Sequence, residues 1–150
     1  MTGGSHPVLT GGCRCGGVRF EISEVLDAGY CHCSQCRRRS GAPVFAFLSV
    51  TDAHFVLLQG DLVNEPSETT GTRYYCNQCR SEIALHYENA EFGVIHALGC
   101  GLLDRPDLVA PVFHQFYADR LEWLNIEDDL PRFSGNQISH PRDRRSPYTG

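Results

Sequence analysis

The spacing of its cysteines constrains this chain more than any other feature of the sequence. Of eight cysteines, seven fall into three short groups. Cysteines this close along a chain do not easily form disulfides with each other, yet together they can hold one tetrahedral metal ion at about 2.3 Å from each sulfur. We name the groups the first pair, the triplet and the second pair: Cys13 and Cys15; Cys31, Cys33 and Cys36; Cys76 and Cys79.

Thiolate ligands make zinc the first candidate metal, since structural zinc sites take four protein ligands. The first pair and the second pair could complete such a closed site, leaving the triplet to hold a second ion with one open position. Alternatively, Cys33 and Cys36 join the second pair in a zinc ribbon, and the first pair and Cys31 remain outside it. Iron–sulfur clusters and copper(I) also suit thiolates, and spacing alone excludes neither.

The composition is that of an ordinary soluble protein of one domain. The 150 residues are 41% hydrophobic and 21% charged, and no apolar run approaches the roughly 20 residues of a membrane span. The formal net charge of −5 argues against a nucleic-acid partner, because such proteins present a basic surface. We expect neither a nucleic-acid nor a membrane partner, and a cytoplasmic location in which the thiols stay reduced.

Short segments with alternating or continuous apolar residues predict strands. The predicted strand segments are 18–22, 43–50, 54–58, 83–87, 92–98 and parts of 112–117. Only 34–39 and 119–124 look capable of a helical turn or two, and 64–70 and 104–108 are expected to be loops. The predicted fold class is therefore mostly β, made of short antiparallel strands with the cysteines in the turns between them.

One ordered domain is predicted over residues 9–133. Residues 135–150 are polar, contain two prolines and three arginines, and lack an apolar period, so we expect a disordered C-terminal tail. Among the charged residues near the end of the domain, Asp128 and Asp129 look like solvated loop charges.

Four motifs, in this order and spacing, carry a resemblance to a known family. They are G-G-C-R-C-G-G-V-R-F at 11–20, C-H-C-S-Q-C-R-R-R-S-G-A-P at 31–43, R-Y-Y-C-N-Q-C at 73–79 and P-V-F-H at 111–114. The chain resembles the glutathione-dependent formaldehyde-activating enzymes, whose domain is shared with centromere protein V. The resemblance covers roughly residues 9–133.

The resemblance implies a β-tent fold and two zinc ions in each chain. In the pattern of the family, Cys13, Cys15, Cys76 and Cys79 hold a structural zinc, while Cys31, Cys33 and Cys36 hold a second, catalytic zinc. The chain departs from this pattern at Arg80, where the family usually has glycine, and at Cys100, where another residue is common. Arg80 bears on the turn geometry of the structural site.

Several further residues are candidates for the site that the resemblance implies. Arg37 is the first candidate to contact the carboxylates of glutathione, because guanidinium groups bind carboxylates in bidentate fashion. His114 matches a position of the family and is a candidate to orient the site. His32 lies between two ligands and is expected to face away from the metal. Cys100 is interpreted as a small buried residue, the alternative being a fourth ligand for the triplet.

The predicted function is that of a zinc-dependent carbon–sulfur lyase. It would join a thiol such as glutathione to formaldehyde or a related small aldehyde, giving S-hydroxymethylglutathione. A zinc ion held by three thiolates suits this reaction, because it polarises a carbonyl poorly but can bind and deprotonate another thiol. The alternatives are a non-catalytic zinc-binding interaction module and a thiol redox or metal-buffering protein.

Overall fold

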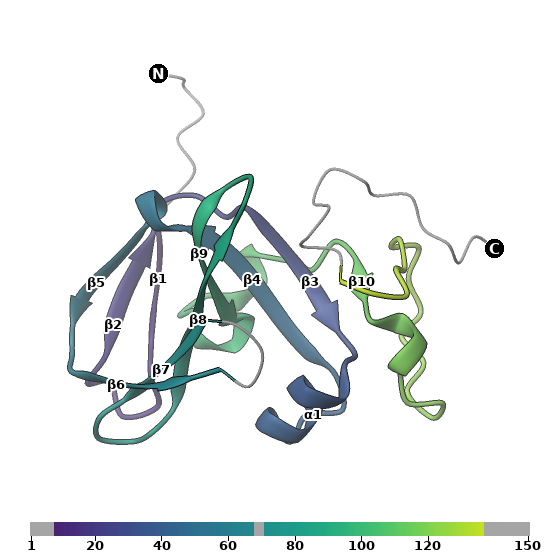
Figure 1. The fold of residues 1–150 in the computed structure, drawn as a ribbon, viewed down its shortest axis with the longest axis horizontal. Helices are drawn as coiled ribbons and strands as arrows, with labels where there is room; N and C mark the ends of the chain where they lie inside the picture. The colour runs from purple at the N-terminus through teal and green to yellow at the C-terminus, as the bar shows by residue number, and fades with distance from the viewer. Residues whose placement is uncertain (1–7, 68–70, 137–150) are drawn as a thin grey trace. The chain divides into compact units, whose positions relative to one another are not determined.

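The computed structural model describes residues 8–67 and 71–136 and contains two compact units that are interleaved along the sequence (Figure 1). The first unit takes the chain up to Leu26 and again Leu48–Val109, and the second takes Asp27–Phe47 and the chain from Ala110 onward. The first pair and the second pair of cysteines therefore lie in the first unit, while the triplet lies in the second.

The first unit is built almost entirely from antiparallel strands. Three of them form a sheet in the order β1-β2-β5: β1 (Leu9–Gly12), β2 (Arg19–Ile22) and β5 (Phe55–Gln59). Four others follow each other along a second sheet: β6 (Leu62–Pro66), β7 (Thr72–Cys76), β8 (Glu82–Asn89) and β9 (Gly93–Gly99). Three short 3₁₀ helices complete this unit: η1 (Asp52–His54), η2 (Cys100–Leu102) and η3 (Pro106–Leu108).

The alternation of side chains explains why these segments form strands. In β2, Phe20 and Ile22 are completely buried while Arg19 and Glu21 are partly exposed, as expected for a strand with one face on the core. Ile83 of β8 and Ile95 and Leu98 of β9 are also fully buried. The apolar core of the first unit thus holds the strands from which its cysteine turns extend.

The second unit combines two paired strands with a short helix. It contains β3 (Asp27–Cys31), α1 (Ser34–Ser40), β10 (His114–Gln115) and η4 (Tyr117–Asp119), and β4 (Phe45–Thr51) begins in it and ends in the first unit. β10 runs parallel to β3, with His114 opposite Tyr30 and Gln115 opposite Cys31. This pairing brings the segment after residue 110 beside the strand that carries the first cysteine of the triplet.

The predicted fold class, mostly β with short antiparallel strands and cysteines in the turns, is confirmed. The predicted segments at 18–22, 43–50, 54–58, 83–87 and 92–98 correspond to β2, β4, β5, β8 and β9, and 34–39 corresponds to α1. Within 112–117 only His114 and Gln115 form a strand. The helix expected at 119–124 was wrong, because the 3₁₀ helix η4 covers Tyr117–Asp119 and residues 120–124 form no helix. The strands β1, β3, β6 and β7 were not predicted, and β6 extends into the expected loop at 64–70.

The domain prediction stays a prediction. Of the tail predicted at 135–150, residues 137–150 lie outside the described part of the chain. None of the helices in the described part combines the length and the apolar character needed to cross a membrane.

Candidate metal centres

The four cysteines of the first unit converge on one point. Cys13 and Cys15 lie in the turn after β1, while Cys76 ends β7 and Cys79 lies in the turn before β8. Their four sulfurs all lie within 4.8 Å of one another, with 3.5 Å between Cys13 and Cys15 and 3.8 Å between Cys15 and Cys76. A tetrahedron with metal–sulfur bonds of about 2.3 Å has edges of about 3.8 Å. The four sulfurs therefore fit one tetrahedral metal ion.

Backbone N–H groups point at these sulfurs from both turns. Val18 N–H donates to Cys13 Sγ over 3.3 Å, and Gly17 N–H to Cys15 Sγ over 3.4 Å. In the other turn the N–H groups of residues 78 and 79 lie 3.4 and 3.5 Å from Cys76 Sγ. Such donors stabilise the charged form of a thiol. Both turns are thus shaped to hold thiolates.

The second of these turns forms with arginine in place of the glycine usual in the family. Arg80 adopts a φ of 63°, a left-handed conformation that costs a residue with a Cβ about 1–2 kcal/mol. Its N–H donates to the carbonyl of Cys76 over 3.1 Å and closes the turn. Nearby, the hydroxyl of Ser81 lies 3.1 Å from Cys79 Sγ and lowers the pKa of that thiol to about 5. Arg80 therefore accommodates the site geometry.

The triplet forms a second cluster, within the second unit. Cys31 ends β3, Cys33 caps the N-terminus of α1 and Cys36 lies in its first turn, and their three sulfurs lie within 4.8 Å of one another. Cys33 is extended and its sulfur accepts the N–H of Cys36 over 3.3 Å, as a capping side chain does. The helix ends at Gly41, whose φ of 75° suits glycine and whose N–H donates to Arg37 O over 2.7 Å.

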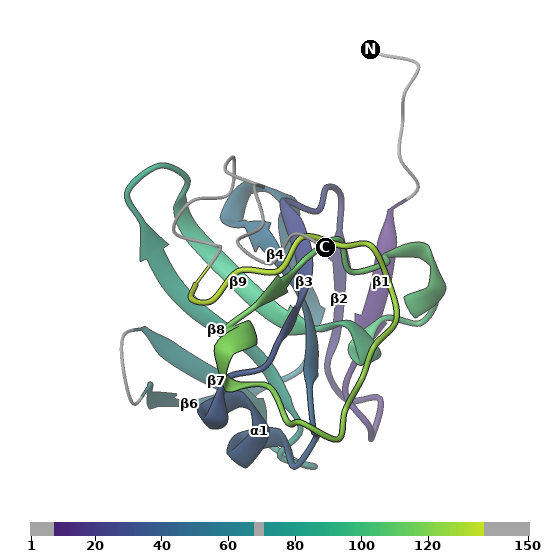
Figure 2. The ribbon, with the colours of Figure 1, turned by 90° about the vertical axis from the view of Figure 1, so that its right-hand side faces the viewer.

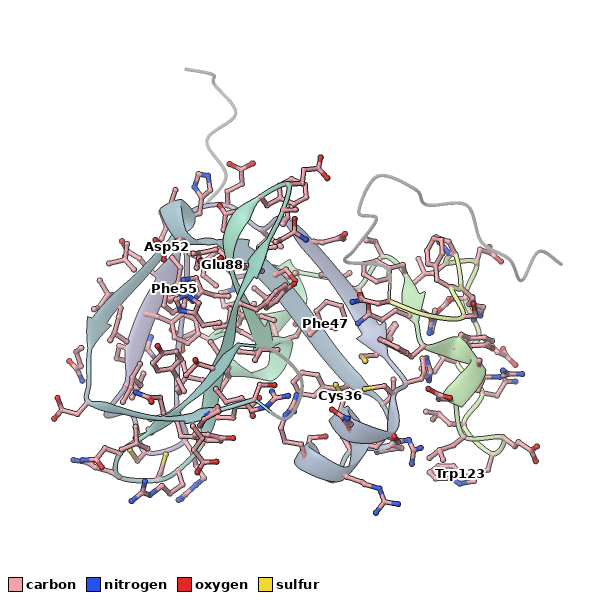
Figure 3. All side chains as sticks on the ribbon, in the orientation of Figure 1. Cys36, Phe47, Asp52, Phe55, Glu88 and Trp123 are labelled. Carbon is pink, nitrogen blue, oxygen red and sulfur yellow. The ribbon has the colours of Figure 1, made fainter. Side chains whose placement is uncertain are left out.

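Aromatic side chains surround the triplet. Buried Cys31 packs with Phe47 and Phe113, and further phenylalanines at 45, 116 and 133 pack against this cluster; Figure 3 labels Cys36 and Phe47. Hydrogen bonds with the thiols of Cys31 and, to a smaller extent, Cys36 lower the pKa of Cys33 to about 2. The same hydrogen bond with Cys33 is the main reason why the pKa of Cys31 is raised. The pKa of Cys36 is raised to about 11, first through its bond with Cys33 and then by burial. Three sulfurs held this close repel each other when ionised, so the cluster favours a cation among them.

A chain of buried polar side chains leads away from the triplet segment. His32 Nε2 lies 2.8 Å from His114 Nδ1, and His114 Nε2 lies 2.9 Å from a carboxylate oxygen of Asp128. The other oxygen of Asp128 accepts a bond of 2.8 Å from Arg132. The exposed fractions are 1% for His32 and 0% for His114, and the ring of Tyr117 packs edge-on against both imidazoles.

This series of hydrogen bonds fixes which nitrogen of each imidazole carries the proton. Burial lowers the pKa of His32 to about 4, with a further contribution from His114, and burial also lowers the pKa of His114. Both rings are therefore neutral at pH 7. The carboxylate of Asp128 only accepts, so His114 donates from Nε2 and accepts at Nδ1. His32 must then donate from Nε2, and its buried Nδ1, which has no hydrogen-bond partner among the described residues, carries a lone pair.

The structure places the other candidate residues as follows. Cys100 is buried at the start of η2, belongs to neither cysteine cluster, and has a pKa raised to about 11 by burial. Arg37 lies on α1, directly after Cys36. The interpretation of Asp128 as a solvated charge was wrong, because its side chain is 21% exposed and bonded to both His114 and Arg132. No periodic or local signal in the sequence pointed to this contact.

The comparisons with known proteins agree with the cysteine geometry. The model of the family described as glutathione-dependent formaldehyde-activating enzyme matches residues 8–119, a span that contains all seven clustered cysteines. The chain belongs to this family.

A protein of Halomonas elongata that carries the name of the same family is 28% identical over 135 residues, covering 80% of this chain and 82% of that protein. The crystal structure of a Rhodobacter sphaeroides protein is similar with a TM-score of 0.51 at 24% identity, covering 68% of this chain and 96% of the other. The latter similarity bears on the fold alone.

Substitutions should separate the two clusters. We predict that Cys79→Ser unfolds the chain, because a structural zinc held by the four cysteines would contribute roughly 10–16 kcal/mol, as much as the whole stability of a typical domain. Cys36→Ser should remain folded and lose one of two metal ions, and the control Cys100→Ser should keep both. Metal content by mass spectrometry and circular dichroism would measure this. If Cys79→Ser and Cys36→Ser unfold alike, the division into two roles is wrong.

The protonation of the buried histidines is also testable. Long-range ¹H–¹⁵N spectra should show His32 and His114 as neutral rings with the proton on Nε2. Because the pKa of His32 is lowered, its neutral form stabilises the fold, and this contribution declines as the pH falls from about 6.5 toward 4. Asp128→Ala should allow His114 to populate both neutral tautomers, because the acceptor at Nε2 is lost. The control Asp129→Ala should leave the proton of His114 on Nε2. A His32 ring that titrates near 6.5 would contradict this account.

Proposed function

We propose that the chain binds two zinc ions, one structural and one catalytic. The fit of four sulfurs to a tetrahedron, with backbone N–H donors around them, supports a closed structural site at Cys13, Cys15, Cys76 and Cys79. The triplet Cys31, Cys33 and Cys36 offers three of the four ligands that a tetrahedral zinc takes, which is the arrangement of catalytic sites.

The proposed reaction is the addition of the thiol of glutathione to formaldehyde. A carbon–sulfur bond forms, the π bond of the carbonyl breaks, and the proton of the thiol goes to the carbonyl oxygen, giving S-hydroxymethylglutathione. No oxidant or reductant is required. The single observation that carries this proposal is the three-sulfur cluster in an apolar surrounding, in a chain that belongs to the formaldehyde-activating family.

A zinc ion held by the triplet would bind the incoming thiol as a thiolate and so supply the nucleophile at neutral pH. The residues of the chain prepare the place for it. Phe47, Phe113 and Phe116 pack around the cluster and bury Cys31, while Cys33 and Cys36 stay partly exposed. Such apolar surroundings strengthen electrostatic interactions. The N–H of Cys36 stabilises negative charge on Cys33, so this thiol is the one that ionises most readily.

His114 is proposed to orient the catalytic site without contacting the substrate. It lies at the pairing of β10 with β3, opposite Tyr30 and next to the partner of Cys31. His114 is hydrogen-bonded to His32, which lies between the ligands Cys31 and Cys33. Asp128 is hydrogen-bonded to His114, and Arg132 to Asp128. This polar chain restrains the segment that carries the sulfurs, as supporting residues do around metal sites.

Exchange spectroscopy tests the proposed activity directly. The zinc-loaded protein should accelerate the exchange of ¹³C-formaldehyde between its hydrate and S-hydroxymethylglutathione, measured by NMR against the uncatalysed rate. Cys36→Ser should abolish the acceleration, because it removes a ligand from the catalytic site.

Cys100→Ser is the matched control and should retain the acceleration, because Cys100 belongs to neither cluster. A wild-type protein with two bound zinc ions and no acceleration would contradict the proposed function, as would full acceleration by Cys36→Ser.

A further inference from the structure

The guanidinium group of Arg39 lies beside the sulfur of Cys36. Its Nη2 is 3.8 Å from Cys36 Sγ, with the guanidinium N–H as the donor and the sulfur as the acceptor. Helix α1 brings the two side chains together, because residues three apart on a helix share a face. In Figures 1 and 2, α1 lies where β3 ends and β4 begins. Arg39 therefore places a permanent positive charge next to one sulfur of the triplet.

The ring of Phe45 holds this guanidinium group in place. Arg39 Cζ is 5.3 Å from the centroid of the ring, a distance at which the face of an aromatic ring attracts a cation. Phe45 is the first residue of β4 and packs against the buried cluster of Cys31, Phe47 and Phe113. The position of the guanidinium group thus depends on the strand as well as on the helix.

The neighbouring arginines of α1 do not share this position. Arg37 and Arg38 follow Cys36 by one and two residues, and side chains at these spacings do not face each other on a helix. Among the residues that the structure describes, neither guanidinium group is hydrogen-bonded to a sulfur. Of three consecutive arginines, the helix turns Arg39 toward the cluster, and Arg38 is exposed.

A cation at this point changes the charge that an incoming ligand would meet. Zinc held by three thiolates carries one negative charge, and a fourth thiolate would bring the total to two. The phenylalanines around the triplet make such a charge costly, because apolar surroundings disfavour it. The charge of Arg39 cancels one of the two. The open position can therefore take an anion in place of a neutral water molecule.

We propose that Arg39, held by Phe45, sets the preference of the three-cysteine site for an external thiolate over a neutral ligand. Arg39 is a positioning residue, since it contacts Cys36 and acts through the charge of the site. This inference rests on the proposed function, in which the triplet holds zinc with one position open. It extends that function by naming the residue that favours a thiolate as the fourth ligand.

Cobalt(II) in both clusters reports the fourth ligand without any catalysis. The thiol is 2-mercaptoethanol, which has no carboxylate to pair with an arginine, and it is titrated at fixed pH while the sulfur-to-cobalt charge-transfer bands are recorded. Arg39→Gln should raise the Kd about tenfold or more, the loss expected for a hydrogen bond between charged groups. The matched control is Arg38→Gln, which removes the same charge from an exposed side chain of the same helix and should bind as the wild type does.

A neutral ligand separates the effect of charge from damage to the site. Imidazole should bind equally well to the wild type and to Arg39→Gln. A second variant, Arg39→Lys, keeps the positive charge and should keep the preference for the thiolate over imidazole. The proposal is overturned if Arg39→Gln binds the thiolate as tightly as the wild type, if it weakens imidazole to the same extent, or if Arg39→Lys loses the preference.

The outcomes distinguish this proposal from the proposed function. Equal thiolate binding by the wild type and Arg39→Gln would overturn the role of Arg39 and leave the proposed function standing. Thiolate binding that depends on Arg39, in a zinc-loaded wild type that does not accelerate the exchange of formaldehyde, would overturn the proposed reaction and leave the role of Arg39 at the metal site. A wild type whose bands respond to no thiol would overturn both.

Discussion

The proximity of cysteine sulfurs is the constraint on which the structure depends, because sulfurs held this close repel each other once ionised and favour a cation among them. In the first unit this constraint joins segments far apart in the chain, since Cys15 and Cys76 are 61 residues apart and their sulfurs lie 3.8 Å from each other. Closing a loop of that length costs conformational entropy that a metal bond can offset. Backbone N–H groups at both turns add stabilisation of each sulfur's charge. The four-cysteine cluster is therefore part of the fold itself.

The sulfurs of the triplet also repel each other when ionised, but a metal ion among them would not join distant parts of the chain. Its three ligands lie within six consecutive residues, 31–36, so a metal ion there closes no long loop. Its position depends instead on packing against phenylalanines and on the pairing of β10 with β3. Long-range contacts thus come from elsewhere, notably the bond between His32 and His114, 82 residues apart.

The sequence was sufficient to predict what depends on local spacing. The cysteine groups, the helical turn at 34–39 and the alternating strand β2 all follow from residues near each other in the chain. β1 and β3 were missed because their glycines, among them Gly11 and Gly29, obscure an apolar pattern, although both pack closely against phenylalanine rings. Asp128 was misjudged because its partner His114 is set by the path of an irregular segment.

The most direct test of the account is whether the three-cysteine cluster accepts an external thiolate. Cobalt(II) is substituted into both sites, and glutathione is titrated while the sulfur-to-cobalt charge-transfer bands are recorded. The account predicts a saturable increase of these bands in the wild type and none in Cys36→Ser. Bands that do not respond to glutathione, in a protein with cobalt in both clusters, would contradict it.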